Sequence, residues 1–355
     1  MGKIYKVGII GCGRVANKYH MPSLKKLENV ELVAFCDLLP ERAEKARADY
    51  GTQDAVVYTD YKLLLADQSI DIVHVCTPNR SHSFITIDAL EAGKHVMCEK
   101  PMAKTYDEAK AMLDAAKRTG KKLTIGYQSR HSDPAQYIKR ACENGTLGEI
   151  YYAKALAVRR RGVPTWGMFL DKEEQGGGPL IDIGTHALDL TLWMMNNYKP
   201  KMVMGTSYQK ITDRAENMDN YAGDWDPEKI SVEDAAFGFI VMENGATIVL
   251  ESSWALNIAD PLEAKCVLCG TEAGADMYDG ARINGVRDGK QYLDKAPVET
   301  GDSATNKQRE MACWIEAIDQ DTDPFVLPEQ ALVVTRILEA IYESAKTGKP
   351  VYFND

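Results

Sequence analysis

An aspartate and a histidine four residues apart, Asp182 and His186, form the pair in this sequence whose types and spacing best suit acid–base chemistry. They follow Gly176-Gly177-Gly178-Pro179, in which the proline suits the first position of a helix and the glycines let the backbone approach another group closely. Four residues are about one helical turn, so we expect both side chains on one face of a helix that starts near Pro179. The spacing alone is equally consistent with an aspartate that favours a helix N-terminus and a histidine in a polar niche.

A glycine-rich turn follows the first predicted strand. Its residues, Gly11-Cys12-Gly13-Arg14-Val15-Ala16, match G-x-G-x-x-A, in which glycines permit close approach of a pyrophosphate to helix N–H groups. Asp37 ends the second predicted strand 24 residues after Gly13, near the spacing of about 20 at which an acidic residue binds the adenosine ribose. Leu38, not an arginine, follows Asp37, so the pattern predicts NAD over NADP. Arg42 weakens this preference if its side chain turns toward the ribose.

Two further strands predicted in this half of the chain end in polar residues. One continues from Cys76 into Thr77-Pro78-Asn79, with His82 shortly after, and the other continues from Cys98 into Glu99-Lys100-Pro101. The carboxyl ends of parallel strands meet at the edge where a dinucleotide binds, so we expect both segments beside the cofactor. Each segment taken alone also fits an ordinary turn or an ordinary charged exit from a strand.

The elements that must position these groups indicate an α/β protein. From residue 4 to about 126, short apolar runs alternate with helical patterns, which is typical of a doubly wound parallel sheet. The clearest helices span residues 40–50 and 106–119, and Gly120 follows the second as a stop signal. We therefore predict a Rossmann-type NAD-binding domain over residues 1–126, with strands at 5–10, 31–36, 55–58, 72–76, 95–98 and 122–126.

The remainder of the chain, residues 127–355, predicts a substrate-binding and oligomerisation domain of the α+β class. Longer alternating strands indicate a large, mainly antiparallel open sheet, and Asn244-Gly245 suits a hairpin turn. An acidic stretch at 213–234 predicts a long loop, which is either a lid or a surface excursion. The strands are expected at 150–159, 201–211, 235–242, 246–254 and 264–268, with a final helix at 328–347.

Composition excludes several classes of protein. The 355 residues exceed one typical core and fit two domains. A formal net charge of -10 argues against a nucleic-acid partner. No apolar run reaches the roughly 18 residues of a membrane span, and the first apolar run is too short for a signal sequence, so we expect a cytoplasmic protein without a membrane partner. The eight cysteines are scattered, and Cys266-x-x-Cys269 lacks a second ligand pair, so we expect neither disulfides nor a metal site.

Taken in order, these segments resemble the glucose-fructose oxidoreductase and inositol dehydrogenase family. The resemblance spans nearly the whole chain, and its specific part is the combination of Glu99-Lys100-Pro101 with Asp182-x-x-x-His186. It implies an NAD-binding domain followed by an open-sheet domain, with Lys100, Asp182 and His186 as the catalytic set. It also implies that the chain forms a homo-oligomer, a dimer or tetramer, because one sheet face needs cover.

Two other segments are similar to family segments that border the ligands. Residues 126–130 resemble the segment that leaves the last strand of the first domain, although an asparagine is common near Gln128 and an aromatic residue often follows Arg130. Residues 159–166 resemble the loop beside the nicotinamide, although the arginines also fit a solvated strand end and Trp166 a packing anchor. The cofactor contacts implied in total are Gly11, Cys12, Gly13, Arg14, Val15, Asp37, Arg42, Thr77, Pro78, Asn79, His82, Glu99, Lys100, Gln128 and Trp166; the substrate contacts implied are Lys100, Tyr127, Arg160, Trp166, Asp182 and His186.

The residue types of the catalytic set suit removal of hydride from a secondary alcohol. His186 is the expected base for the hydroxyl proton, because a histidine titrates near neutral pH. Lys100 is expected to donate to the reacting oxygen and to stabilise its developing charge, while Asp182 holds a substrate hydroxyl. An Asp–His pair also binds metals, but the sequence places no third ligand beside this one.

We therefore predict an NAD-dependent dehydrogenase that acts on a ring hydroxyl of a sugar, glycoside or cyclic polyol, with C3 of a glycoside as the specific case. Two other functions stay open. One is a hydrolase or lyase that retains NAD and oxidises its substrate transiently, which the Glu99-Lys100-Pro101 segment disfavours because the glycosidase branch of the family differs there. The other is a non-catalytic NAD(H) sensor, which would not need the proton path that Lys100, Asp182 and His186 provide.

Overall fold

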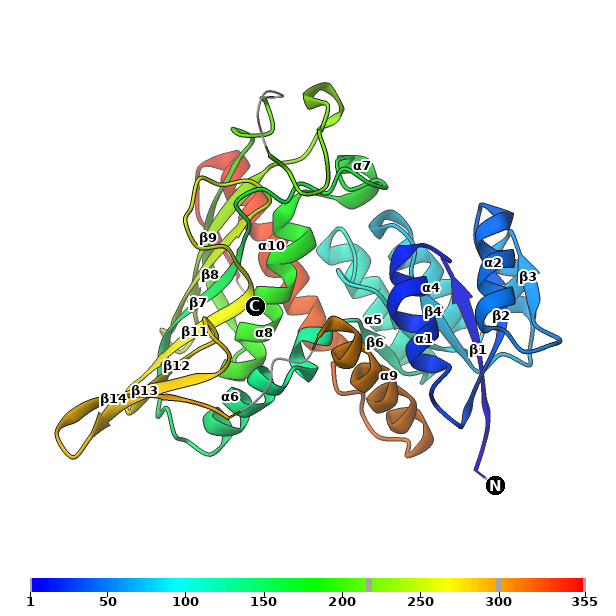
Figure 1. Cartoon of the computed structure of the whole chain (residues 1–355), viewed down its shortest axis with the longest axis horizontal. Helices are drawn as coiled ribbons and strands as arrows, with labels where there is room; N and C mark the ends of the chain where they lie inside the picture. The colour runs from blue at the N-terminus through cyan, green and yellow to red at the C-terminus, as the bar shows by residue number, and fades with distance from the viewer. Residues whose placement is uncertain (1, 215–218, 298–301, 354–355) are drawn as a thin grey trace. The chain divides into compact units, whose positions relative to one another are not determined.

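The computed structural model describes residues 2–214, 219–297 and 302–353. The chain divides into two compact units (Figure 1). The first consists of Met1–His131 and Asp302–Leu332, and the second of Ser132–Gly301 and Val333–Asp355. The predicted division into residues 1–126 and 127–355 stays a prediction; packing adds the return segment Asp302–Leu332 to the first unit.

The first unit contains a six-stranded parallel sheet of the predicted doubly wound type. Its strand order is β3-β2-β1-β4-β5-β6, so the direction of winding reverses between β1 and β4. In such sheets the ligand binds where the winding reverses, outside the carboxyl ends of the strands. The strands are β1 (Tyr5–Ile10), β2 (Val30–Cys36), β3 (Val56–Tyr58), β4 (Ile72–Val75), β5 (His95–Cys98) and β6 (Leu123–Ile125).

Helices connect these strands at positions where the sequence signals are strong. Thr105 caps α5 (Tyr106–Thr119) by accepting a hydrogen bond from the Glu108 amide, and Gly120 ends this helix in the left-handed conformation. The other helices are α1 (Met21–Leu24), α2 (Pro40–Tyr50), α3 (Tyr61–Ala66) and α4 (His82–Glu91), together with the π-helical turn η1 (Ala16–His20) and the 3-10 turns η2 (Asn79–Ser81) and η3 (Gln128–His131).

The return segment completes the first unit with α9 (Ser303–Asp319). Met311, Trp314 and Ile315 of this helix lie in the same buried apolar cluster as Val7 and Ile9 of β1. The helix packs against α1 and η1. A segment distant in the sequence therefore supplies part of the core behind the first strand.

The second unit contains a nine-stranded sheet, ordered β14-β13-β12-β11-β7-β10-β9-β8-β15. Only β7 and β10 pair in parallel among these strands, so the predicted mainly antiparallel character is confirmed. Asn244 and Gly245 form the β9–β10 hairpin turn, in which Gly245 has a φ of 88°. The strands are β7 (Ile150–Val158), β8 (Pro200–Tyr208), β9 (Ala235–Met242), β10 (Thr247–Ser253), β11 (Leu262–Gly270), β12 (Ala273–Asp276), β13 (Arg282–Arg287), β14 (Lys290–Lys295) and β15 (Val351–Tyr352).

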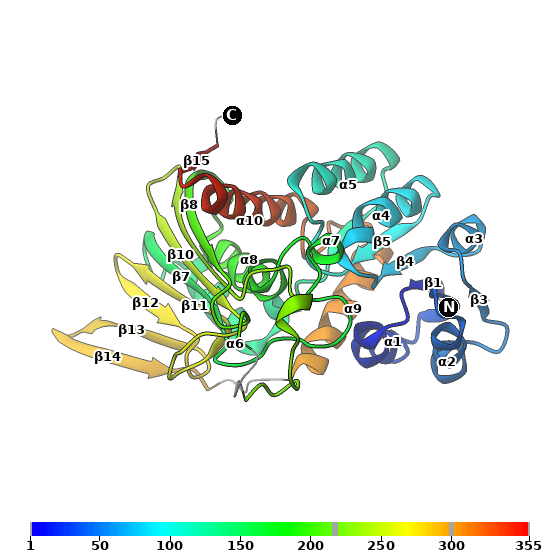
Figure 2. The same ribbon diagram turned by 90° about the horizontal axis from the view of Figure 1, so that it is seen from above.

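Helices cover one face of this sheet (Figure 2). The helix α8 (Thr185–Met195) packs on β7 and β11, and α10 (Pro328–Thr347) packs on β8 and β9. Gly205 and Gly238 are register partners on neighbouring strands, and an added Cβ on either would overlap Ile341 of α10. These two glycines therefore let the helix approach the sheet closely. The unit also contains α6 (Asp133–Glu143), α7 (Lys172–Gln175), the π-helical turn η4 (Leu180–Gly184) and the 3-10 turn η5 (Pro227–Lys229).

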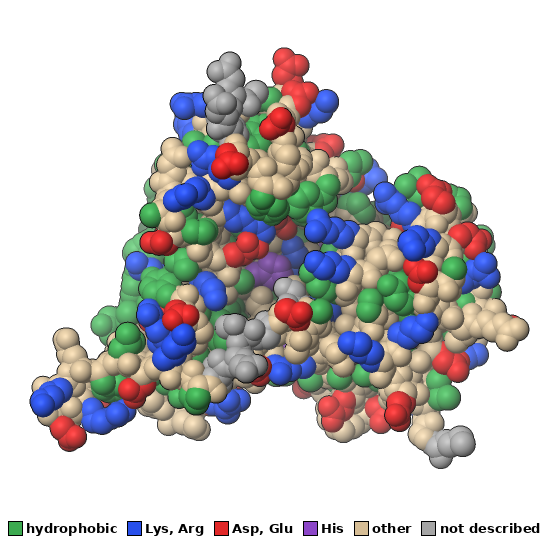
Figure 3. All heavy atoms as spheres, in the orientation of Figure 1, with side chains coloured by type: hydrophobic (Ala, Val, Ile, Leu, Met, Phe, Trp, Pro, Cys, Tyr) green, Lys and Arg blue, Asp and Glu red, His purple; other side chains and the backbone are tan. Residues whose placement is uncertain are grey.

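The opposite face of the sheet carries apolar side chains that remain accessible. Met204, Phe239 and Val249 are register partners across three strands, and Met204 and Phe239 are 38% and 46% exposed. Hydrophobic side chains gather along this side of the second unit (Figure 3). Among the helices that the structure describes, none is long and apolar enough to cross a membrane.

Candidate active site

The predicted cofactor loop follows β1 and starts the turn η1. Gly11 has a φ of 91°, and an added Cβ there would lie 2.6 Å from the Cys76 carbonyl oxygen, so a side chain is excluded. A Cβ added to Gly13, by contrast, meets no atom within 4 Å. The loop therefore combines a tight turn with open space beside the helix start. This is the arrangement that an anionic pyrophosphate requires.

Asp37 holds this loop from the end of β2. Its Oδ2 accepts a hydrogen bond from the Cys12 amide at 2.8 Å, and its Oδ1 accepts from the Leu39 amide at 3.0 Å. The side chain stays partly exposed, and a carboxylate has further lone pairs, so it can also accept from ribose hydroxyls. Burial raises the pKa of the Cys12 thiol to about 12, so Cys12 offers the loop its backbone rather than a thiolate. Arg42 is exposed in the first turn of α2.

His82 connects the segments that follow β4 and β5. Its Nε2 lies 2.9 Å from the Thr77 carbonyl oxygen and its Nδ1 lies 2.7 Å from the Pro101 carbonyl oxygen. The ring is buried, and burial lowers its pKa although both carbonyls oppose this shift. Because both ring nitrogens face protein atoms, the structure favours a role for His82 in fixing the two segments over direct contact with a ligand. Pro78 is exposed beside them, and Thr77 and Asn79 are partly exposed.

Glu99 and Lys100 have different environments although they are adjacent. Glu99 is buried, and its Oε1 accepts hydrogen bonds from His20 at 2.6 Å and from Lys307 at 2.7 Å. Its Oε2 accepts from the Lys100 amide at 3.2 Å. The Lys100 side chain is partly exposed. Of this pair, only Lys100 is accessible to a ligand at the carboxyl edge of the sheet.

The segment after β6 is mostly buried. Tyr127 is fully buried, so its side chain has no exposed surface for the predicted contact with substrate. Arg130 is also fully buried and donates to the Gln330 side chain at 2.6 Å. Gln128 is partly exposed and is the accessible side chain of this segment among the three. Burial lowers the pKa of His131, which follows Arg130, to about 3.

In the second unit, the glycine-rich segment before Asp182 is filled by protein groups. An added Cβ on Gly177 would overlap the Tyr342 hydroxyl, and one on Gly178 would overlap the Glu233 carbonyl oxygen. The Glu233 carboxylate accepts hydrogen bonds from the Gly178 amide (2.9 Å), the Leu180 amide (3.2 Å) and the Tyr342 hydroxyl (2.8 Å). An internal carboxylate therefore caps this helix start, where an anion is favoured. No local sequence signal connects Glu233 to this helix.

Asp182 and His186 lie on either side of a change in helix type. Asp182 belongs to the π-helical turn η4, and His186 belongs to the first turn of α8. The sequence predicts a plain α-helix here; the structure inserts a wider turn, of the kind that often occurs at functional sites. Both side chains are partly exposed. The predicted helix is therefore confirmed in position, with a local geometry that the four-residue spacing does not reveal.

Trp254 fixes the Asp182 carboxylate. Its indole nitrogen donates a hydrogen bond to Asp182 Oδ2 at 3.0 Å, and the side chain is 1% exposed. A rigid, buried donor of this kind restricts the rotation of the carboxylate. Trp254 follows β10, 72 residues after Asp182, so local patterns do not reveal it.

The arginine cluster 159–161 is held by protein groups. Arg159 forms an ion pair with Glu263, and although burial lowers its pKa, Glu263 and then the charge of Asp182 raise it above the ordinary value. Arg160 is exposed and donates to the carbonyl oxygens of Ile258 (2.7 Å) and Ala259 (3.2 Å). A substrate that contacts Arg160, as predicted, would therefore share its guanidinium group with the loop that contains Ile258 and Ala259. Trp166 is partly exposed, and its ring centroid lies 6.5 Å from that of Tyr221.

The acidic loop predicted at 213–234 is tied to the segment that carries Trp166, apart from residues 215–218, which lie outside the described part. Asn220 pairs with both the amide (3.0 Å) and the carbonyl (2.9 Å) of Val163. Trp225 is buried and donates from its indole nitrogen to the Thr212 carbonyl oxygen at 3.0 Å. These contacts give the loop fixed attachment points at Val163 and Thr212.

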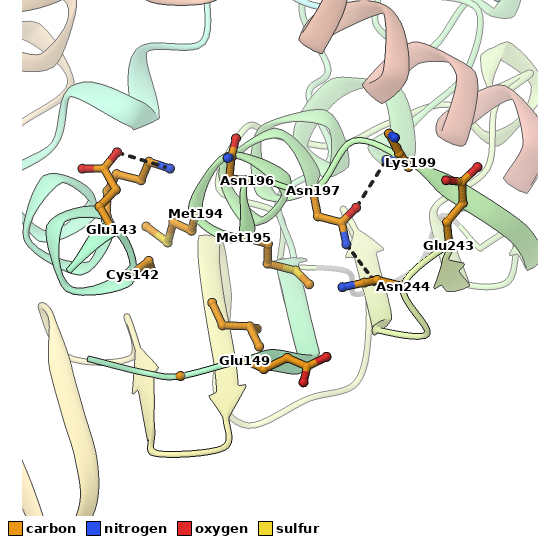
Figure 4. Close-up of a pocket in the computed structure, with 13 residues that line it drawn as sticks. Cys142, Glu143, Glu149, Met194, Met195, Asn196, Asn197, Lys199, Glu243 and Asn244 are labelled. Atoms are coloured by element: carbon orange, nitrogen blue, oxygen red, sulfur yellow. Dashed lines mark hydrogen bonds and ion pairs between the residues drawn. The ribbon is translucent and has the colours of Figure 1, made fainter. Parts of the chain in front are cut away.

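A cavity of about 870 Å³ lies at the C-terminal end of α8 (Figure 4). Asn197 and Asn244, which both line it, form a hydrogen bond with each other, and Lys139 pairs with Glu143 at one side. The helix spans 11 residues, about 16 Å, so this cavity is remote from Asp182 at the opposite end. It is therefore not part of the candidate site. In the described ranges, no group of three His, Cys, Asp or Glu side chains is placed to hold a metal ion.

The predicted site residues thus form two sets. In the first unit the glycine loop, Asp37, Asn79 and Lys100 follow strands of one parallel sheet, at the edge where a dinucleotide binds. In the second unit Asp182 and His186 lie on one helix, with Trp254 and Arg159 beside Asp182. The joint action of Lys100 with Asp182 and His186 stays a prediction, because these residues belong to different units.

Comparison with known protein families covers most of the chain. Residues 5–127 match the model of an oxidoreductase family described as an NAD-binding Rossmann fold, and residues 139–353 match the model of the C-terminal alpha/beta domain of that family. The D-glucoside 3-dehydrogenase of Escherichia coli (strain K12) is 39% identical over 346 residues, which are 98% of this chain and 97% of that protein.

Solved structures share the fold over nearly the full length. An aldose-aldose oxidoreductase from Caulobacter crescentus, solved with glycerol, has a TM-score of 0.80 at 25% identity and matches 99% of this chain and 100% of that one. A levoglucosan dehydrogenase, solved with NADH and levoglucosan, has a TM-score of 0.83 at 22% identity and matches 99% of each chain. At that identity the second likeness concerns the fold alone.

Proposed function

This chain belongs to the family of NAD-binding oxidoreductases whose two domain models match it, and from that premise we propose that it oxidises a ring hydroxyl of a sugar, glycoside or cyclic polyol. The observation that carries the proposal is the Asp182/His186 pair, with Asp182 fixed by Trp254, in a chain 39% identical to a D-glucoside 3-dehydrogenase over nearly its full length. The similarity to that enzyme favours C3 of a glycoside as the carbon that is oxidised.

In the proposed complex, the first unit holds the dinucleotide. The open space beside Gly13 receives the pyrophosphate, and the amides of the helix start face its charge. Asp37 accepts hydrogen bonds from the adenosine ribose and repels a 2′-phosphate, which favours NAD over NADP. Thr77, Asn79 and Lys100 follow the strands at the same edge. When bound, NAD supplies the hydride acceptor.

The catalytic residues of the proposed reaction manage one proton and one developing charge. His186 removes the proton from the hydroxyl group that is oxidised. Lys100 donates a hydrogen bond to the same oxygen and stabilises its negative charge as the carbonyl forms. Asp182 accepts a hydrogen bond from a neighbouring substrate hydroxyl, and the Trp254 hydrogen bond keeps its carboxylate in one orientation.

The experiment that tests this function is a panel of sugars, glycosides, inositols and hydroxy acids, assayed for NADH formation with NAD. We expect activity on pyranoses, glycosides or inositols and none on simple aliphatic alcohols. NMR of the product locates the oxidised carbon; a position other than C3 contradicts only that refinement. Activity confined to hydroxy acids contradicts the polyol substrate. Product without net NADH indicates a hydrolase or lyase that retains NAD, and neither product nor NADH indicates a sensor.

We also propose that the chain forms a homo-oligomer through the open face of its large sheet. Met204, Phe239 and Val249 form an apolar row on this face, which another copy of the chain would cover. Phe239→Asp places a charge in that row and is expected to reduce the mass measured by light scattering. An unchanged oligomer with this substitution would contradict the proposed surface.

A further inference from the structure

A buried cluster of charged and imidazole side chains lies at the carboxyl end of β5. Glu99 Oε1 contacts Lys307 Nζ on α9 at 2.7 Å and His20 Nε2 on η1 at 2.6 Å. Lys307 also pairs with Glu310 at 2.7 Å, and His20 Nδ1 lies 3.0 Å from His74 Nδ1 on β4. The Lys307 side chain is 1% exposed and the Glu99 side chain 9%. The ligand-binding scheme proposed above uses none of these charges.

The cluster has one consistent arrangement of protons. Burial alone would raise the pKa of Glu99, but Lys307 and His20 lower it well below the ordinary value, so Glu99 is an anion. Burial and then the charge of Lys307 lower the pKa of His20, so His20 is neutral. A neutral His20 that donates from Nε2 to Glu99 must accept at Nδ1 from His74. The His74 Nε2 atom is then a buried acceptor with no hydrogen-bond partner among the described residues.

Glu99 also contacts the main chain of the neighbouring residue, Lys100. Its Oε2 accepts a hydrogen bond from the Lys100 amide at 3.2 Å. Its carboxylate also packs against the end of β6, because a Cβ added to Gly126 would lie 3.1 Å from Oε1. Lys307 and His20 therefore hold the carboxylate from two helical segments, and the carboxylate holds the main chain from which the Lys100 side chain extends.

We propose that Lys307 is a positioning residue for Lys100: its ammonium group fixes the Glu99 carboxylate, and that carboxylate fixes the main chain of Lys100. The proposal rests on the catalytic role proposed above for Lys100. Lys307 follows Glu99 by 208 residues and reaches it through the return segment, so the first unit obtains this cation from a distant part of the chain. Lys307 acts through Glu99 and need not contact substrate or cofactor.

Lys307→Met removes the charge and keeps a side chain of similar length. A displacement of about 1 Å at a catalytic group lowers the rate by about 100-fold, so we expect kcat to fall by about 10- to 100-fold. The KM for NAD should change little, because the open space at Gly13 and the Asp37 carboxylate lie outside this cluster. Amide hydrogen exchange at Lys100 should become faster, since its acceptor is no longer fixed.

The protonation of the cluster gives a second measurement. The titratable groups that face Glu99 and His20 are His74 and Cys76 from the end of β4, Cys98 from β5, His82 from α4, and Lys307 and Glu310 from α9. Without the Lys307 cation, the pKa of His20 should rise, because the lysine charge lowers it and Glu99 raises it. NMR of the ring should show His20 titrating at higher pH in Lys307→Met than in the wild type, together with an added titration in the kcat profile.

Two further variants separate positioning from general stability. Glu99→Gln and Glu99→Gln/Lys307→Met should have similar kcat values, because Lys307 acts only through the Glu99 carboxylate; a further large loss in the double variant contradicts the proposal. This comparison also decides the matter if Lys307→Met does not fold. Lys110→Met, which removes an exposed charge from α5 of the same unit, should behave as the wild type.

A folded Lys307→Met protein with wild-type kcat, or with unchanged exchange at the Lys100 amide, would overturn the proposal. If the wild type oxidises no substrate of the panel, the proposed function fails, whereas the Lys100 exchange and the His20 titration still decide whether Lys307 positions the Lys100 main chain. The two failures are therefore distinguishable.

Discussion

Two glycine-rich helix starts, one in each unit, look alike in sequence and differ in what occupies them. Both continue into a π-helical turn, η1 after Gly13 and η4 after Pro179. A Cβ on Gly13 meets open space, whereas Cβ atoms on Gly177 and Gly178 would overlap protein groups. The first start leaves room for an incoming anion, and the second is already capped by the Glu233 carboxylate. Glycines before a helix therefore indicate close approach, and only the structure shows whether a ligand or the protein approaches.

We call the helix start at Gly13 the open start and the one at Gly177-Gly178, which protein groups fill, the closed start. The difference predicts that residues after the closed start contribute to catalysis and not to cofactor binding. His186→Ala should lower turnover by about a hundredfold or more while NAD affinity stays nearly unchanged, because the imidazole acts on the substrate proton. Lys100→Ala should have an effect of similar size through the developing charge. Steady-state kinetics and NAD titration measure both. Near-normal turnover of His186→Ala across pH would mean that the base lies elsewhere.

The open start should depend on Asp37. Asp37→Asn removes the charge and keeps one oxygen, which can accept from the Cys12 amide while the Leu39 amide loses its acceptor, so the loop should keep one of its two hydrogen bonds to this side chain. A charge-assisted hydrogen bond contributes roughly 1.5–3 kcal/mol, so NAD affinity should fall by about tenfold to hundredfold. Calorimetric titration with NAD and NADP measures this. Equal affinity of the wild type for both nucleotides would show that Asp37 does not read the ribose.

A matched pair of substitutions tests the comparison directly. Gly178→Ala introduces a Cβ where Glu233 already lies, and overpacking of this kind costs about 1–3 kcal/mol of folding stability. Gly13→Ala should change stability by less than about 0.5 kcal/mol, because its Cβ meets no atom, and should instead weaken NAD binding. Urea denaturation and NAD titration of both proteins separate the two effects. Equal destabilisation would refute the distinction between an open and a closed start.

The closed start should also depend on the donor that fixes Asp182. Trp254→Phe keeps a buried ring and removes the indole N–H, so kcat/KM should fall by about tenfold, the lower end for a hydrogen bond to a charged group. Trp225→Phe removes a buried indole donor that bonds a backbone carbonyl in the same unit, and it should leave activity unchanged. Equal losses in both variants would indicate general destabilisation instead of orientation of Asp182.

The smallest expected effect concerns the cap of the closed start. Burial raises the pKa of Glu233 although the amides of Gly178 and Leu180 and the Tyr342 hydroxyl oppose this. The folded protein thus binds this proton more tightly than the unfolded chain, so the contribution of Glu233 is most favourable at low pH and is lost as pH rises above the ordinary glutamate value. Glu233→Gln should therefore weaken the decline in melting temperature between pH 4.5 and pH 7. An identical pH dependence in both proteins would contradict the raised pKa.

Local patterns predicted much of the fold, because short apolar runs between helical stretches mark buried parallel strands. The ranges of β1, α2 and α5 were predictable to the residue for this reason. The short, mostly exposed strands β13 and β14 give no such signal. In the first unit, the glycine loop lies at a helix start, and Asp37 and the segments that begin at Thr77 and Glu99 follow strand ends, as predicted. The Asp182/His186 pair lies at the predicted helix start of the second unit.

What the sequence does not reveal are contacts between distant residues. Trp254 reaches Asp182 across 72 residues, and Lys307 reaches Glu99 across 208. Each contact depends on how a sheet or helix packs, which periodicity does not specify. The π-helical turn between Asp182 and His186 is hidden for another reason, since a single wider turn leaves the spacing of apolar residues almost unchanged.

The return segment Asp302–Leu332 has a consequence for the order of events during synthesis. A ribosome that adds about 5–20 residues per second completes residue 131 on the order of ten to thirty seconds before it reaches Lys307. Throughout that interval the nascent first unit lacks α9. The apolar residues of β1 that pack against this helix are therefore uncovered, and Glu99 lacks its ion pair with Lys307. The nucleotide-binding unit, although encoded first, therefore cannot complete its core until residues 302–332 have been synthesised, late in translation.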